Sequence, residues 1–268
     1  MIRSIIKEVQ KPEPIVALWN WPLPFWLMVS YIVAFGALGL LPITTARDVD
    51  ITNPDAFSWF MAGNIAALIM LWVVVRNIWS ALIDEREEAR QNPAKKQTAA
   101  ELSVRKLLGL TESHTRPLWI VILFGFGVMV GVDAVSLALG RGGVFPIGLD
   151  RIEQDMIDAW IAATIFYAIL RPLIEAIIFQ GILYAALAKH LEDNLLAVLI
   201  TAAVYALFYF LQVVGNGGWL TAYWGILFPF ALNVCAGIAR ASTKSTWSAV
   251  GIYSLTGLFI LLSTAIAV

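Results

Sequence analysis

Long apolar runs, separated by short segments that carry charge, glycine or proline, make up most of this sequence. A bilayer core of about 30 Å takes about 20 helical residues per crossing, and seven runs have about this length. They lie at 24–41, 57–82, 117–139, 157–188, 195–214, 219–239 and 247–268. The pattern predicts an all-α polytopic membrane helix bundle of about seven transmembrane spans, folded as a single integral membrane domain over 1–268.

The fourth run is long for one perpendicular crossing and contains Pro172. Proline removes a helical hydrogen bond and kinks a helix, and a long span can also tilt. One kinked span and two half-segments that meet near Arg171 are both compatible with this run. We favour the single kinked span, which gives an odd number of spans and places the two termini on opposite sides of the membrane.

Basic residues are distributed unevenly between the two sides of the predicted bundle. Thirteen of the 18 Lys and Arg residues fall on the side of the N-terminus, and only Arg47, Arg141 and Arg151 fall on the opposite side. Because cytoplasmic segments carry the excess of Lys and Arg, we expect a cytoplasmic N-terminus over 1–23 and a C-terminus outside.

The longest segment between runs, 84–116, is predicted to be a cytoplasmic loop. It opens with a charge run at 84–90, and four leucines within 102–110 lie beside Arg105 and Lys106. This spacing suits a short amphipathic helix lying in the membrane interface. A solvated loop with a nascent helix fits the segment equally well.

The composition agrees with a membrane protein and excludes other classes. The chain is 60% hydrophobic and 14% charged, with a mean hydropathy of +0.79. Soluble domains average about 45–50% hydrophobic residues and about 25% charged residues. A net charge of −1 leaves no basic field for nucleic acid. The single cysteine, Cys235, cannot form a disulfide within the chain.

Ionisable side chains within apolar runs are costly and are therefore candidates for function. The intramembrane polar candidates are Asp133 in the third run, Arg171 and Glu175 in the fourth, and Asn233 in the sixth. Arg171 and Glu175 are four residues apart on one helix and can neutralise each other. A structural ion pair and a functional site are both open interpretations of this pair.

Most catalytic motifs are absent from the sequence. It contains no H-E-x-x-H, G-x-S-x-G, P-loop or cysteine cluster. The two histidines, His114 and His190, fall in or beside predicted cytoplasmic segments. We therefore predict no metal site and no cofactor.

One segment of the fourth run nevertheless carries a family signature. Residues 171–183 read R-P-L-I-E-A-I-I-F-Q-G-I-L. They resemble the first signature of the CAAX-protease and bacteriocin-processing (CPBP, or Abi) family of intramembrane proteases, commonly P-x-x-E-E-x-x-F-R-G-x-L. Pro172, Glu175, Phe179, Gly181 and Leu183 match this signature. Ala176 replaces the second glutamate, and Gln180 replaces the arginine.

The two later signatures of the family can be placed by position. F-x-x-x-H falls at 205–209, with Tyr209 in place of the histidine, and H-x-x-x-N falls at 253–257, with Tyr253 and Gly257 in place of the histidine and asparagine. The resemblance implies a CPBP-like core over 157–268. It also implies that active members use glutamate and histidine to activate a water for peptide cleavage, with the asparagine in a supporting role. Metal participation is left open.

We therefore favour a degenerate family member over an active enzyme. Its vestigial site positions are Glu175, Ala176, Gln180, Tyr209, Tyr253 and Gly257. Tyrosine, alanine and glycine supply no base or metal ligand in place of the missing residues. The leading hypothesis is a catalytically inactive structural or assembly subunit of a membrane complex, with membrane lipids and other transmembrane proteins as partners. A bacterial plasma membrane is the expected location, and an organelle membrane is the alternative.

Small residues favour close contacts between helices in membranes and motivate the predicted protein partners. They are Gly181, Ala185 and Ala188 on the fourth run, and Ala231, Ala236 and Gly237 on the sixth. Packing within the chain explains them equally well.

Two alternative functions remain open. The first is an intramembrane protease, or another membrane hydrolase, that uses Glu175 together with Asp133 or Asn233. The second is the binding or transport of a lipid, quinone or pigment in a cavity walled by aromatic residues.

Overall fold

The computed structural model describes residues 9–10, 18–19, 22–39, 56–91, 102–111, 118–140, 149, 152, 156–213 and 221–267. Within these residues the chain is helical and contains no β-strand. Its elements are α2 (Pro22–Gly39), α3 (Ala56–Gln91), α5 (Val104–Leu107), α6 (Leu118–Ala138), α7 (Ile157–Ile165), η3 (Phe166–Leu170), α8 (Arg171–Glu175), η4 (Ala176–Leu183), α9 (Tyr184–Leu191), α10 (Asn194–Val213), η6 (Tyr223–Leu227), α12 (Phe228–Thr243) and α13 (Thr246–Ala267). The all-α polytopic bundle predicted from the sequence is confirmed.

Among the described residues, six helices are long and apolar enough to cross a membrane. They are Ala56–Gln91, Leu118–Ala138, Ile157–Leu191, Asn194–Leu211, Tyr223–Thr243 and Thr246–Ile266, and they coincide with six of the seven predicted spans. The first predicted span coincides with α2, which is not one of these six. The total of seven spans and the opposite placement of the termini therefore stay predictions.

The fourth predicted span is one continuous helix, as we favoured. It runs from Ile157 to Leu191 without a break and contains two stretches of π-helix, η3 and η4, on either side of α8. Pro172 lies in the first turn of α8. Because Pro172 has no N–H to donate to the preceding turn, the wider turns of η3 come where regular α-helical bonding cannot continue.

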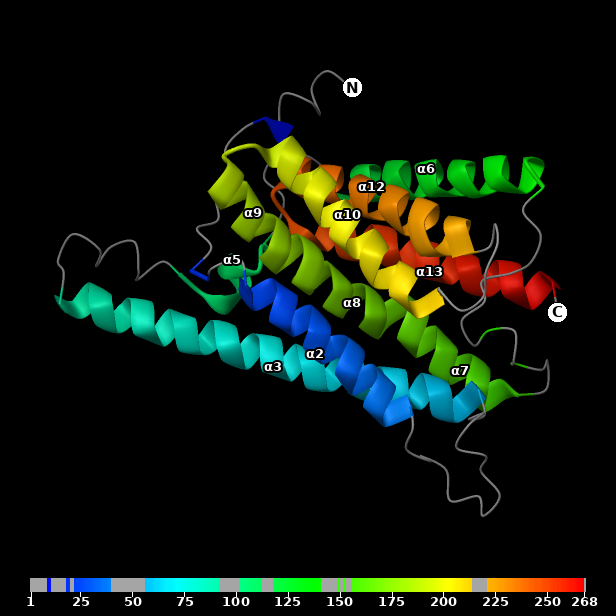
Figure 1. Cartoon of the computed structure of the whole chain (residues 1–268), viewed down its shortest axis with the longest axis horizontal. Helices are drawn as coiled ribbons and strands as arrows, with labels where there is room; N and C mark the ends of the chain where they lie inside the picture. Colours follow the sequence, from blue (N-terminus) through cyan, green and yellow to red (C-terminus); the bar gives the residue numbers. More distant parts are fainter. Residues whose placement is uncertain are drawn as a thin grey trace, which may run out of the picture.

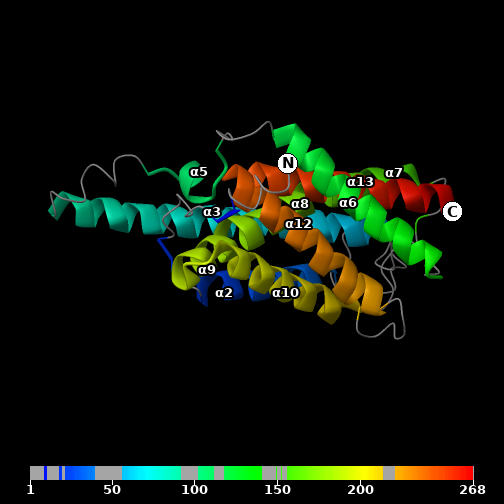
Figure 2. The ribbon, with the colours of Figure 1, turned by 90° about the horizontal axis from the view of Figure 1, so that it is seen from above.

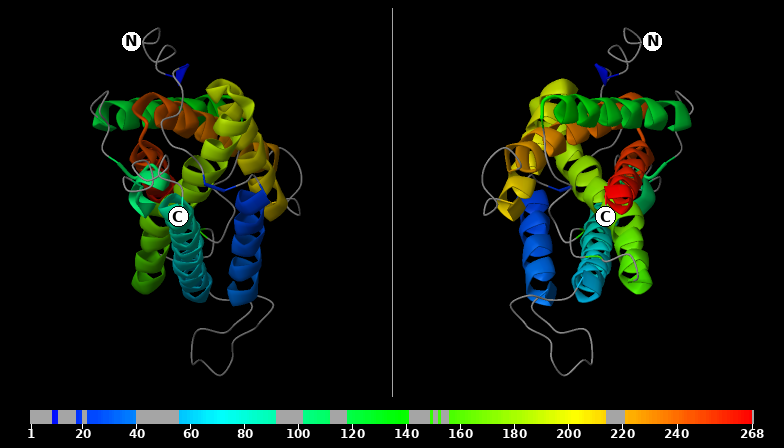
Figure 3. Two further views of the ribbon diagram at one scale, coloured as in Figure 1. Left: turned by 90° about the vertical axis from the view of Figure 1, so that its left-hand side faces the viewer. Right: turned by 90° about the vertical axis from the view of Figure 1, so that its right-hand side faces the viewer.

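This long central helix organises the bundle (Figure 1). Helices α2 and α3 pack against one side of it, and α13 packs against η3, α8 and η4 from another. Helix α10 lies against α12 and η6, which closes the group of helices around α8. Helix α6 packs on α12 and α13 and runs across them at the edge of the bundle, as Figure 2 and Figure 3 show.

The predicted cytoplasmic loop at 84–116 is wrong at its start. Helix α3 continues through the charge run to Gln91 and extends past the rest of the bundle (Figure 1). The run is rich in Glu, Arg and Ala, which favour helix, and Pro93 disfavours helical conformation at the residue before it. The charge run therefore belongs to a helix that projects from the bundle.

The interfacial helix predicted for the second half of that loop is also replaced by a different arrangement. Within its described part, 102–111, the helical residues are the four of α5, and Leu107 and Leu108 are buried in the core of the protein. The turn between α12 and α13 holds this segment, because Thr246 donates from its backbone N–H to the Gly109 carbonyl (2.8 Å) and from its hydroxyl to the Leu108 carbonyl (2.7 Å). The leucines thus pack within the bundle.

Two glycines mark the closest approaches of backbones near the central helix. A Cβ atom at Gly181 would lie 3.0 Å from the Leu108 carbonyl oxygen, and one at Gly257 would lie 2.0 Å from the Tyr167 carbonyl oxygen. The second distance is far below any tolerable contact. Helices α13 and η3 therefore meet at a point where only glycine fits.

The small residues that motivated a predicted partner surface mostly pack inside the chain. Ala185 and Ala236 are fully buried, and a Cβ atom at Gly237 would lie 2.8 Å from the side chain of Val198. Packing within the chain, the alternative explanation, accounts for these positions.

Substitution of Gly257 by alanine should destabilise the bundle by about 3 kcal/mol, the upper range for overpacking of a core. The reason is that the group in the way is a backbone carbonyl, which cannot rotate aside as a flexible side chain can. The measurement is unfolding in a mild detergent, followed by tryptophan fluorescence.

Gly127→Ala on α6 is the matched control, because a Cβ atom at Gly127 meets nothing within 4 Å. Alanine is better than glycine inside a helix by about 0.5–1 kcal/mol, so this variant should be as stable as the parent or more so. Equal stability of the Gly257→Ala variant and the parent would show that α13 and η3 do not approach this closely.

Candidate functional site

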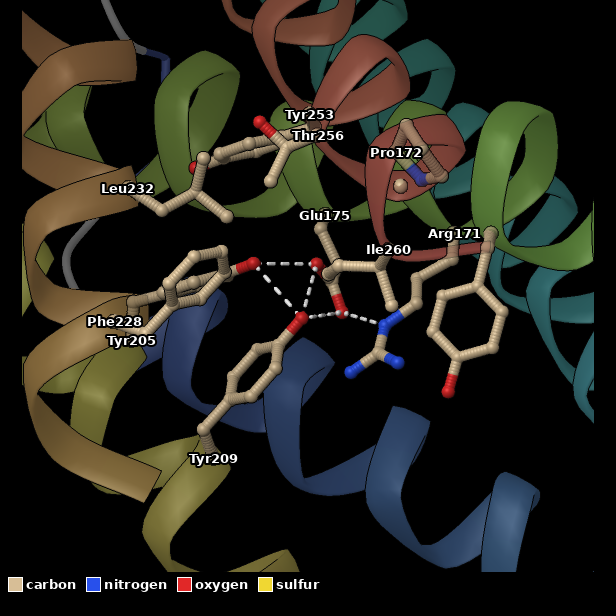
Figure 4. Close-up of a pocket in the computed structure, with 12 residues that line it drawn as sticks. Arg171, Pro172, Glu175, Tyr205, Tyr209, Phe228, Leu232, Tyr253, Thr256 and Ile260 are labelled. Carbon is tan, nitrogen blue, oxygen red and sulfur yellow. Dashed lines mark hydrogen bonds and ion pairs between the residues drawn. The ribbon is translucent and has the colours of Figure 1, made fainter. Parts of the chain in front are cut away.

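The centre of the site is the carboxylate of Glu175, which is 2% exposed. Arg171 donates from Nε to Oε1 (2.8 Å), and Tyr205 donates from its hydroxyl to Oε2 (2.7 Å). The Tyr209 hydroxyl lies 3.1 Å from Oε2 and 3.0 Å from the Tyr205 hydroxyl. Figure 4 shows these groups converging on one carboxylate from α8 and α10. Three side-chain donors of the same chain therefore surround Glu175.

Arg171 is held by aromatic rings as well as by Glu175. Its guanidinium carbon lies 4.8 Å from the ring centre of Tyr209, 5.3 Å from that of Tyr167 and 5.5 Å from that of Phe166. The negative faces of aromatic rings attract a cation, and more strongly where water is excluded. The rings therefore share with Glu175 the stabilisation of a charge inside an apolar helix.

A second polar cluster lies beside the first and joins three helices. Gln180 donates from Nε2 to Oδ1 of Asn233 (2.9 Å), and Asn233 donates from Nδ2 to the hydroxyl of Tyr253 (2.7 Å). The ring of Tyr253 stacks on that of Tyr205, with centres 5.7 Å apart and planes 5° apart. This stacking connects the amide cluster to the carboxylate cluster.

A small cavity lies at this junction, partly open on one side. Its lining residues are Tyr167, Arg171, Pro172, Glu175, Tyr205, Tyr209, Phe228, Leu232, Tyr253, Thr256, Gly257 and Ile260. The space available to the centres of water-sized molecules is about 30 Å³. One water molecule needs about 10–15 Å³ by this measure, so the cavity holds two or three non-hydrogen atoms.

The structure brings most of the sequence-predicted site residues together. Arg171, Glu175, Tyr209, Tyr253 and Gly257 all line the cavity. Gln180 and Asn233 form the adjoining amide cluster, and Ala176 is fully buried but does not line the cavity.

Asp133 lies elsewhere, on α6. It accepts a hydrogen bond from the hydroxyl of Tyr223 (2.9 Å) and is not part of the cavity wall. Asn233 has hydrogen bonds with Gln180 and Tyr253, and none is formed with Glu175 among the described residues. Neither residue stands beside Glu175 as a catalytic partner in this arrangement.

The position at which the family signature has its asparagine is closed. Gly257 packs directly against the backbone of Tyr167, so a side chain of any size there would displace η3 or α13. The replacement of asparagine by glycine is thus built into the packing of the bundle.

Sequence reasoning missed Tyr205, which donates the shortest hydrogen bond to Glu175. Two signals were available. Tyr205 occupies the first position of the second family signature, and it precedes Tyr209 by four residues, which places both hydroxyls on one face of α10. The contribution of Tyr167 from η3 had no comparable signal, because it depends on how the helices pack.

Among the residues that the structure describes, no group of three or more His, Cys, Asp or Glu side chains could hold a metal ion. Glu175 is the only acidic residue in the lining of the cavity. The polar chemistry of this cavity comes from hydroxyl donors, one carboxylate and one guanidinium.

Comparison with known protein families agrees with the resemblance seen in the sequence. Residues 157–259 match the family model described as "Type II CAAX prenyl endopeptidase Rce1-like". The matched segment begins with α7 and ends within α13, so it contains every residue of the cavity lining except Ile260. No curated protein and no solved structure gave a significant match. The family resemblance is confirmed over this part of the chain.

Replacement of Glu175 by glutamine should destabilise the protein by about 3–5 kcal/mol, because it leaves the buried charge of Arg171 without its partner. Unfolding in mild detergent is the measurement. Glu87→Gln on the exposed end of α3 is the matched control and should change stability by less than about 0.5 kcal/mol.

The double variant Arg171→Met, Glu175→Gln removes both charges and should recover much of this loss. Replacing a buried ion pair by apolar or neutral groups of similar size is often close to neutral. If the double variant were no more stable than Glu175→Gln alone, the energetic coupling that we assign to the pair would be refuted.

Proposed function

We propose that this chain, with its Rce1-like segment at 157–259, is a catalytically inactive membrane protein that acts as a structural or assembly subunit of a membrane complex. The proposed inactivity rests on the hydrogen bonds that Glu175 accepts. This residue is the one glutamate of the family signature that the chain retains, and three donors of the chain occupy its carboxylate.

A general base must accept a proton from a water that lies within hydrogen-bond reach. The carboxylate of Glu175 already accepts from Arg171, Tyr205 and Tyr209. Donors of the chain itself therefore occupy three of the roughly four lone-pair sites of this carboxylate, which leaves little of it open to a water molecule. This arrangement favours a structural carboxylate.

The residues at the other signature positions support the same conclusion. Tyr209 and Tyr253 bring phenol groups, which remain protonated near neutral pH and act as hydrogen-bond donors. The hydroxyl of Tyr253 is engaged by Asn233, and Gly257 brings no side chain at all. A tetrahedral intermediate would find neither an imidazole nor an amide at these three positions.

The proposed assembly role is supported by an exposed face of α6. Among the six candidate spans, α6 has the smallest share of buried residues. Gly127 and Gly131 are exposed and four residues apart, and Cβ atoms at either position would meet nothing within 4 Å. Small residues at this spacing allow the backbone of a second transmembrane helix to approach closely.

The test of inactivity is cleavage of a farnesylated C-A-A-X peptide by the purified protein in liposomes, with an active protease of the same family run in parallel. We expect the parent chain and the Glu175→Gln variant to give the same background signal. Turnover by the parent that is lost in a folded Glu175→Gln variant would overturn the proposal.

The test of assembly is the mass and composition of the species extracted from the native membrane in mild detergent. We expect a discrete complex of fixed stoichiometry that is lost when Gly127 and Gly131 are replaced by leucine. The matched control is Ala265→Leu on the exposed face of α13. A monomer in every extraction, or equal loss of the complex with Ala265→Leu, would contradict the assignment of this face.

A further inference from the structure

The guanidinium of Arg171 has hydrogen-bonding capacity that the chain does not use. Its Nε donates to Glu175, and no other hydrogen bond to Arg171 is formed among the described residues. Figure 4 shows its two terminal nitrogens directed away from Glu175. The side chain is nevertheless buried, with 7% of its surface exposed.

Unused donors on a buried cation are energetically unfavourable. A guanidinium has five N–H groups, and a buried charge with unmade hydrogen bonds carries a large desolvation cost. The ring faces of Tyr167, Tyr209 and Phe166 attract the charge but do not replace directional acceptors. The terminal nitrogens of Arg171 are not among the fully enclosed polar atoms without a partner, so an acceptor group from outside the chain can reach them.

The size of the cavity limits what this acceptor can be. The space of about 30 Å³ corresponds to two or three non-hydrogen atoms when each water-sized group needs about 10–15 Å³. The ring of a quinone or pigment exceeds this space, and so does a phosphate group with its four oxygens. A carboxylate, with one carbon and two oxygens, has the right size.

A carboxylate fills this space, so a hydrocarbon chain attached to it would leave the cavity through its open side. Phe228, Leu232 and Ile260 contribute apolar side chains to the lining, and the cavity is partly open. Thr256 also lines it, and its buried hydroxyl makes no hydrogen bond among the described residues. A polar head with an apolar tail matches both features.

We propose that this cavity binds the carboxylate of a long-chain fatty acid, with the terminal nitrogens of Arg171 as its donors. The two nitrogens of a guanidinium form a fork that matches the two oxygens of a carboxylate. Tyr205 and Tyr209 stabilise the charge of Glu175, which leaves part of the charge of Arg171 for the ligand. This binding goes beyond the proposed assembly role and does not depend on it.

The experiment titrates the purified full chain in lipid nanodiscs with oleic acid labelled with ¹³C at its carboxyl carbon and follows the carboxyl resonance by NMR. We expect a distinct bound resonance that saturates at one oleate per chain. Methyl oleate and oleyl alcohol, which lack the carboxylate, should compete at least tenfold more weakly.

The neutral double variant Arg171→Gln, Glu175→Gln should lose at least tenfold in affinity for oleate. Leu232→Phe, which narrows the cavity and leaves Arg171 in place, should weaken binding in the same direction if the double variant does not fold. The matched control is Arg76→Gln, which removes an exposed cation on α3 outside the cavity and should bind oleate as the parent does.

Several outcomes would overturn the proposal. They are the absence of a saturable resonance with the folded parent chain, unchanged affinity in both cavity variants, and equal competition by methyl oleate. Displacement of oleate by dioleoyl phosphatidic acid at equal concentration would assign the site to phosphate and would also refute it. Peptide cleavage and extraction from the membrane are measured independently of oleate binding. A failure of the oleate proposal is therefore distinguishable from a failure of the proposed function.

Discussion

The buried ion pair between Arg171 and Glu175 is the interaction on which the rest of the core depends. Two charges in the middle of an apolar helix are tolerated only when the protein replaces the water that they have lost. Here the replacement comes from two other helices and one π-helical segment: hydroxyls of Tyr205 and Tyr209 on α10, the stacked ring of Tyr253 on α13, and the face of Tyr167 on η3. The solvation of one carboxylate and one guanidinium thus fixes how four elements meet.

Close backbone packing makes this solvation possible. Gly257 lets α13 approach η3 to a distance that no side chain would permit, and this approach brings Tyr253 against Tyr205. The π-helical turns on both sides of α8 also contribute to this packing, since they allow Pro172 within a continuous helix. The polar cluster and the irregular helix are therefore two parts of one arrangement. A substitution in either should change the packing of the other.

Local pattern was sufficient to predict the helices but not all of their ends or contacts. Apolar runs of membrane-spanning length placed the helices to within a few residues. Polarity alone predicts a loop for the charge run before Gln91, but Glu, Arg and Ala favour helix, and the run is helical. The family signature located Glu175 and Tyr209, whereas Tyr205 and the closure at Gly257 depend on packing between distant segments, for which one sequence carries little direct signal.

The persistence of Glu175 in a site that lacks the other signature residues has a physical explanation within the proposed function. Removal of either charge alone leaves the other buried and unpaired, which costs about 3–5 kcal/mol and is a large fraction of the stability of a typical protein. Removal of both together is tolerable, but it requires two simultaneous substitutions. Ala176, Gln180 and Gly257 are neutral, so a substitution at these positions leaves no buried charge without its partner. A carboxylate that has acquired its own cation on the same helix therefore remains in place for structural reasons, whatever chemistry its neighbours support.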